Sequence, residues 1–136
     1  MRPGRYLSIA LVSVATLPWC LATAHAADRL QGAWVTSAGL CDEVFTKRNG
    51  RVVFKPNAED WSAFIVDGKH IRGARVTCDL ISAKQKGDVT SFLLGCKSRI
   101  MFGTISVSAR FETDDKFVRF DPEFPEVETT YNRCSR

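Results

Sequence analysis

The sequence predicts an all-β fold: an antiparallel up-and-down barrel of about eight strands, with a curled β-sandwich as the alternative. Turn signals recur at short intervals, and the segments between them are strand-like. No long segment has a helical hydrophobic period, and the only helix we expect is a single turn at residues 28–30. Closure into a barrel would also remove the exposed edges that an open sheet of this size presents.

The first 26 residues have the features of a signal peptide. Arg2 and Arg5 supply a positive start, an apolar stretch follows, and Ala24 and Ala26 have the small-x-small spacing that a signal peptidase reads. We therefore expect cleavage after Ala26, and a mature protein that is periplasmic or secreted.

Two other interpretations of this segment are weaker. Cys20 could anchor a lipoprotein, but the bulky Trp19 immediately before it does not suit a lipobox. A permanent transmembrane helix is disfavoured by the cleavage signal and by the polar chain beyond it, so no stable membrane span is expected after cleavage.

Removal of residues 1–26 from the 136-residue chain leaves one domain, residues 27–136, which is large enough for one core. The formal charge of the whole chain is +4, and the loss of Arg2 and Arg5 with the signal lowers it to about +2. The remaining basic residues are scattered along the domain. A charge this weak and dispersed does not favour nucleic acid as a partner.

The first strands of the domain are expected at residues 30–37 and on both sides of Asn49-Gly50. An Asn-Gly pair between two apolar runs is the strongest short hairpin signal, and this one opposes Phe45 to Phe54.

Asp67-Gly68 predicts a second hairpin. A turn at this dipeptide sets Phe64 opposite Ile71 and Ile65 opposite His70.

The last strands follow a further hairpin around Gly87. Strands at residues 100–112 and 116–120 are joined by a tight turn at Thr113-Asp114-Asp115, and a short final strand occupies residues 129–134. The two prolines in the intervening segment, residues 121–128, predict an ordered loop across one end of the barrel.

Four cysteines remain after the signal is removed, and an even number in an exported chain indicates two disulfides. Four cysteines allow three pairings, and hairpin geometry selects one of them. Cys78 and Cys96 are equally distant from Gly87, so a turn centred there makes them cross-strand partners. Cys41 and Cys134 are then left to pair with each other.

The hydrophobic pattern supports this register independently of the cysteines. It gathers on one face of the hairpin the residues Val76, Cys78, Leu80, Phe92, Leu94 and Cys96. A shift by one residue would mix the apolar and polar sets. Zinc sites and thioredoxin-like redox centres both require close cysteine pairs, which this chain lacks, so we expect structural bridges.

The segment "LQGAWVTS", residues 30–37, resembles the first strand of calycin or lipocalin-like barrels, with their Gly-x-Trp signature at Gly32-Ala33-Trp34. The resemblance implies that Trp34 closes one end of the barrel against an arginine near the last strand, and Arg133 has the matching position. The segment also resembles bacterial metalloprotease inhibitors of the alkaline-protease-inhibitor type. The chain as a whole is similar to small exported proteins of Gram-negative bacteria whose function is uncharacterised.

The sequence does not indicate an enzyme, and it implies no metal and no cofactor. His70, the only histidine of the domain, follows a turn and is expected at the surface. The glutamates near the prolines at the end of the chain are expected on a solvated loop, and the glycines are dispersed rather than gathered into a phosphate-binding loop.

Aromatic residues are numerous enough either to line a ligand cavity or to fill the barrel. Because small barrels pack their interiors with side chains, the filled core is the favoured interpretation. The candidates for cavity or core are Trp34, Trp61, Phe45, Phe54, Phe64, Phe92 and Phe102.

These observations together predict a non-enzymatic binding module of the cell envelope, whose partner is a small apolar ligand or an envelope protein. The alternative is a periplasmic protease inhibitor of the alkaline-protease-inhibitor type. In those inhibitors an N-terminal arm enters the protease cleft, and the corresponding stretch here, residues 27–29, is short. A ligand binder should contain a continuous apolar cavity, whereas an inhibitor should have a filled barrel and an extended arm.

Peptide mapping of the exported protein under non-reducing conditions tests the disulfide assignment. We expect one cross-linked peptide pair joining Cys78 to Cys96 and a second joining Cys41 to Cys134. A peptide joining Cys41 to Cys78 or to Cys96 would contradict the hairpin register.

Overall fold

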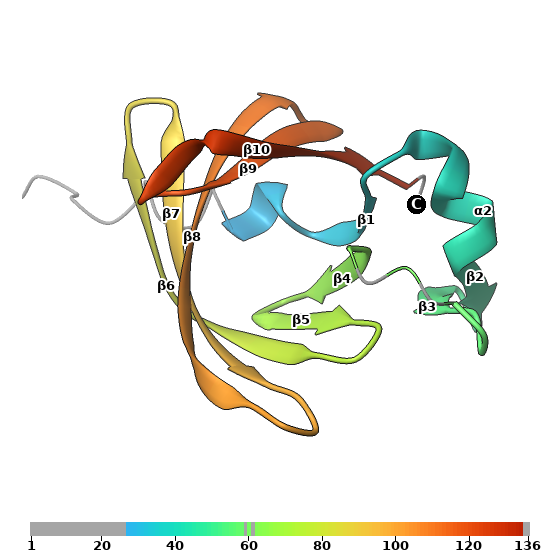
Figure 1. The fold of residues 1–136 in the computed structure, drawn as a ribbon. Coiled ribbons are helices and arrows are strands. Elements are labelled where there is room, and N and C mark those ends of the chain that lie inside the picture. The colour runs from blue at the N-terminus through green and yellow to red at the C-terminus, as the bar shows by residue number, and fades with distance from the viewer. Residues whose placement is uncertain (1–26, 59, 61, 135–136) are drawn as a thin grey trace, which may run out of the picture.

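Eight antiparallel strands form a closed barrel in the computed structural model, which describes residues 27–134 except 59 and 61 (Figure 1). The strands neighbour one another in the order β1-β10-β9-β8-β7-β6-β5-β4, and β1 closes the barrel by pairing with both β10 and β4. Their bounds are Gly32–Val35 (β1), Phe64–Asp67 (β4), His70–Gly73 (β5), Thr77–Lys86 (β6), Val89–Lys97 (β7), Phe102–Thr113 (β8), Lys116–Asp121 (β9) and Phe124–Arg133 (β10). The predicted up-and-down barrel is confirmed.

The signal peptide predicted at residues 1–26, with its alternative anchor Cys20, lies outside the described residues. So does Trp61. The helical turn expected near residues 28–30 is present at residues 27–29. In the described part of the chain, no helix is both long enough and apolar enough to cross a membrane.

A separate hairpin lies outside the barrel, between β1 and β4 in the chain. It consists of β2 (Phe45–Arg48) and β3 (Arg51–Phe54), preceded by a 3-10 turn, η1 (Ala38–Leu40), and a short helix, α2 (Cys41–Val44). Its turn is the predicted Asn49-Gly50, both with positive φ, and Phe45 opposes Phe54 as expected. The barrel therefore reaches eight strands without this hairpin.

The β6–β7 hairpin contains both the predicted cross-strand cysteine pair and an unpredicted bulge. Its turn is two residues long, since Lys86 pairs with Val89. Continued without a break, that register would misalign Cys78 and Cys96 by one residue. A bulge between Leu80 and Ser82 restores the alignment, so Cys78 pairs with Cys96 and the inward faces match again.

The predicted register of the β4–β5 hairpin is wrong by two residues. The turn is Gly68-Lys69, with Gly68 at φ +61°, so Phe64 lies opposite Gly73 and Ile65 opposite Arg72. The left-handed backbone at the first turn position suits glycine, and this places Asp67 in the strand rather than in the turn. A shift of two leaves every side chain on its predicted face.

The C-terminal segment also differs from the prediction. The turn at Asp114-Asp115 is confirmed, but the proline-containing segment is a β9–β10 hairpin rather than a loop across the barrel end. β10 begins at Phe124 instead of residue 129, and a shift in register between Phe124 and Glu128 allows Pro125 to remain within the strand.

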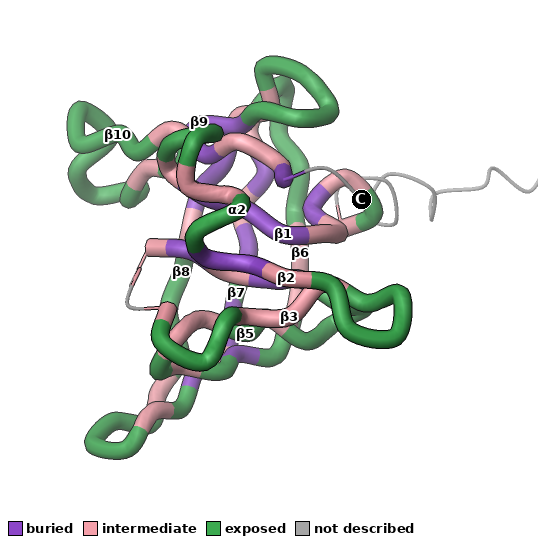
Figure 2. Tube along the Cα trace, turned by 90° about the vertical axis from the view of Figure 1, so that its right-hand side faces the viewer, coloured by how far each residue is buried: buried purple, intermediate pink, exposed green. Residues whose placement is uncertain are grey.

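Two apolar clusters contain alternate residues of β1, Trp34 in one and Ala33 and Val35 in the other. Figure 2 shows β1 as a largely buried strand. Trp34 points into the barrel, whereas Ala33 and Val35 point toward α2 and the β2–β3 hairpin. Each cluster contains a disulfide. Cys78–Cys96 lies in the barrel cluster, and Cys41–Cys134 lies in the second cluster. In the chain-entropy model, bridges over loops of these lengths each contribute about 3 to 5 kcal/mol.

Candidate ligand cavity

One end of the barrel is sealed by Trp34 and Arg133, the pair that the Gly-x-Trp resemblance implied. They are direct partners in the β1–β10 register, and the guanidinium carbon lies 4.4 Å from the centre of the indole ring. The Trp34 indole N–H donates to the carbonyl of Leu30 at 2.8 Å, which holds the N-terminal turn against the ring.

The Arg133 guanidinium also ties together segments that are far apart in the chain. It donates to the carbonyls of Arg29 (2.7 Å), Gln31 and Asp114 (2.6 Å), and its Nε lies 3.0 Å from the Asp115 carboxylate. The Arg133 side chain is only 6% exposed, so these contacts compensate the cost of burying its charge. The N-terminal turn, β1, β10 and the β8–β9 turn are therefore joined at one point.

An aromatic cluster lies directly inside this seal. Phe117 packs edge-on against Trp34 at 4.7 Å and stacks on Tyr131 at 5.1 Å between ring centres. Phe64 and Phe111 complete the cluster from β4 and β8, at 5.1 Å from Tyr131 and 5.3 Å from Phe117 respectively. The barrel is thus filled near its closed end.

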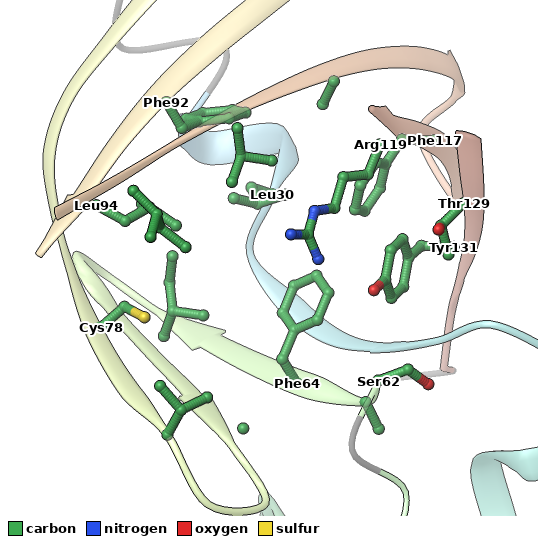
Figure 3. A pocket seen from close by; sticks show the side chains of 17 residues that line it. Leu30, Ser62, Phe64, Cys78, Phe92, Leu94, Phe117, Arg119, Thr129 and Tyr131 are labelled. Carbon is green, nitrogen blue, oxygen red and sulfur yellow. The ribbon is translucent and has the colours of Figure 1, made fainter. Parts of the chain in front are cut away.

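Beyond the cluster the barrel is hollow, with a cavity of about 410 Å³ (Figure 3). The preference for a filled interior is therefore wrong. Small side chains such as Ala109 line part of this space beside the aromatic rings and do not fill it. The lining residues are Leu30, Ser62, Ala63, Phe64, Ile71, Gly73, Val76, Cys78, Phe92, Leu94, Ile105, Val107, Ala109, Phe117, Arg119, Thr129 and Tyr131.

The aromatic residues singled out in the sequence have different places in the structure. Phe64 and Phe92 line the cavity, whereas Trp34 lies at the sealed end of the barrel, against Arg133. Phe45 and Phe54 belong to the second cluster, outside the barrel, because their hairpin leaves the sheet. Phe102 is 88% exposed at the start of β8, so its assignment to cavity or core is wrong.

Four lining residues on β9 and β10 were not anticipated: Phe117, Arg119, Thr129 and Tyr131. The alternation of side chains along β9 and β10 could have identified these residues from the sequence. Phe117 and Arg119 are two residues apart, as are Thr129 and Tyr131, so each pair shares a face. Arg119 is the one charged side chain among the described lining residues.

His70 lies outside the cavity, on the exposed face of β5. Its Nδ1 is 2.5 Å from the Asp79 carboxylate of the neighbouring strand. Among the described residues, no three His, Cys, Asp or Glu side chains are grouped as ligands for a metal ion.

Comparisons with protein-family models, with curated proteins and with solved structures found no match to this chain. The closed barrel of eight antiparallel strands is consistent with a lipocalin-like architecture.

Substitution of Arg133 tests the seal. Arg133→Met keeps much of the side-chain volume but leaves the carbonyls of Gln31 and Asp114 without their donor, so we expect the free energy of unfolding to fall by about 3 kcal/mol. Urea denaturation measures the loss.

Arg72→Met is the matched control, because Arg72 is an exposed arginine on the outer face of β5. It should change the unfolding free energy by less than about 0.5 kcal/mol. Equal effects of the two substitutions would show that the seal does not stabilise the fold.

Proposed function

We propose that this protein is an exported, non-enzymatic binding module that holds a small apolar ligand inside its barrel. The observation that carries the proposal is the cavity of about 410 Å³. Sites for small molecules are concave, mostly apolar and on the order of 300–1,000 Å³, with a few polar groups that orient the ligand. The cavity has this size and this composition.

The chemistry of the lining favours an apolar occupant. Leu30, Phe92 and Leu94 form the interior wall together with other aliphatic and aromatic side chains. A space bounded by such groups offers water few hydrogen bonds, and its walls lack the dispersion contacts of a close-packed core. An apolar ligand would restore those contacts and shield the walls from water.

The architecture would keep such a site in place. The Cys78–Cys96 disulfide joins β6 and β7, two strands that line the cavity. The contact between Trp34 and Arg133 holds the closed end of the barrel together. Two disulfides are consistent with an oxidising compartment, as expected for a protein of the envelope or the exterior.

The inhibitor alternative has less support. It requires an extended N-terminal arm, whereas residues 27–29 form a helical turn against the closed end of the barrel. The Arg29 guanidinium lies 4.4 Å from the centre of the Phe111 ring, and Leu30 is buried in the barrel cluster. These contacts hold the described N-terminal residues to the barrel rather than presenting them to a protease.

Binding of the neutral fluorophore Nile red to the protein purified from a periplasmic extract tests the proposal. The exported protein should shift the probe to the emission of an apolar environment. Val107→Phe should weaken the binding at least about tenfold, because Val107 lines the cavity and the larger ring occupies ligand space.

Ser106→Phe is the control, since Ser106 immediately precedes Val107 on β8 and is exposed on the outer face. It adds a phenyl ring without filling the cavity, and its binding should match that of the wild type. Circular dichroism checks that both variants are folded. Unchanged binding by Val107→Phe, or equal losses in both variants, would contradict an interior site.

A further inference from the structure

We propose that the ligand of this cavity is an amphipathic anion: an apolar chain or ring system with one negatively charged group, which is bound by Arg119, the charged residue of the described lining. This inference rests on the proposed function and specifies the chemical class of the ligand.

Arg119 lies on the same face of β9 as Phe117, two residues farther along the strand from the sealed end. Phe117 is 3% exposed at the aromatic floor, whereas Arg119 is solvent-exposed while still lining the cavity. Its register partners on β8 and β10 are Ala109 and Thr129, which also line the cavity. Figure 3 shows the guanidinium directed inward, toward the ring of Phe64.

The Arg119 side chain makes no hydrogen bond or ion pair with any residue that the structure describes. By contrast, Arg110 on the neighbouring strand lies 3.0 Å from Glu128, and Arg133 is bound to Asp115. A guanidinium carries five N–H donors that cannot be deprotonated under ordinary conditions. An arginine that lines an apolar cavity with those donors unused is suited to an anion supplied by a ligand.

Two hydroxyl groups on β10, those of Thr129 and Tyr131, also line the cavity. Tyr131 stacks on Phe117, and its hydroxyl has no hydrogen-bond partner among the described residues. Thr129 lies beside Arg119 in the β9–β10 register, and its hydroxyl also lacks such a partner. Ser62 differs, because its hydroxyl is 2.5 Å from the Asp60 carboxylate. The free donors therefore lie on the β9–β10 side.

The charge of the lining favours a single negative group on the ligand. The described lining residues include no aspartate and no glutamate, so a cationic or zwitterionic head group would meet Arg119 without a compensating acid. A carboxylate matches the planar fork of the Arg119 guanidinium and can accept two parallel hydrogen bonds from it. The aliphatic and aromatic part of the lining accommodates the apolar part of the molecule.

The test compares two ligands of equal chain length, decanoate and decanol, by displacement of Nile red at neutral pH. Arg119→Gln should lower the ratio of decanoate affinity to decanol affinity about tenfold, because only decanoate loses a charged partner. Decanol affinity should stay within about twofold of the wild-type value. Arg119→Lys should restore part of the ratio, since it keeps the charge but not the fork.

Arg72→Gln is the matched control, an exposed strand arginine that does not line the cavity, and the ratio should not change. An unchanged ratio in Arg119→Gln, or equal losses for both ligands, would overturn the assignment of an anionic ligand while leaving an apolar site intact. Failure of the wild-type protein to bind Nile red and decanol at all would instead overturn the proposed function, and this inference with it.

Discussion

Closure of the barrel depends on one cross-strand pair, Trp34 and Arg133. β1 has only four residues, and it must hydrogen-bond to β4 on one side and β10 on the other. At the β10 side, the directly opposed partners place a guanidinium over an indole ring, and that guanidinium reaches three separate backbone segments. Because the next residue, Cys134, is bridged to Cys41, the same short stretch also attaches the outer hairpin to the barrel. The closure is thus fixed both covalently and by buried polar contacts.

The seal determines where the barrel is filled and where it is hollow. Phe117 packs against Trp34, and the other rings gather around Phe117, so the aromatic volume is concentrated at the closed end. The rest of the interior is lined mainly by aliphatic and small residues, and Arg119 is the one charged side chain among the described lining residues. A ligand with an apolar body and one anionic group would match this apolar lining with its single charged residue. Its recognition would then need no mobile part of the protein, only the preformed cavity.

Much of the fold could be predicted from local patterns, because those patterns act over short distances. Asn49-Gly50 specifies its turn directly, and the symmetric positions of Cys78 and Cys96 around Gly87 indicate their bridge. The details that were predicted wrongly are strand registers, which depend on a choice between turns that differ by one residue. The Asp67-Gly68 pair also permits a turn one residue later, at Gly68-Lys69. The bulge at Ile81 is needed because the two-residue turn after Lys86 would otherwise leave Cys78 and Cys96 misaligned by one residue. The cavity could not be predicted, since alternation gives the direction of Arg119 but not the volume left between side chains of different strands.

The central claim is that the hollow interior, and not the outer surface, receives an apolar molecule. Isotope-edited nuclear Overhauser spectroscopy of the exported protein with decanol measures this directly, because Leu93 and Leu94 are adjacent residues that point in opposite directions. Leu94 lines the cavity, and Leu93 is exposed outside it. The account predicts contacts from decanol protons to the methyl groups of Leu94 and Val107, and none to those of Leu93. Contacts to Leu93 and the exposed Ile81 without any to Leu94 would contradict it.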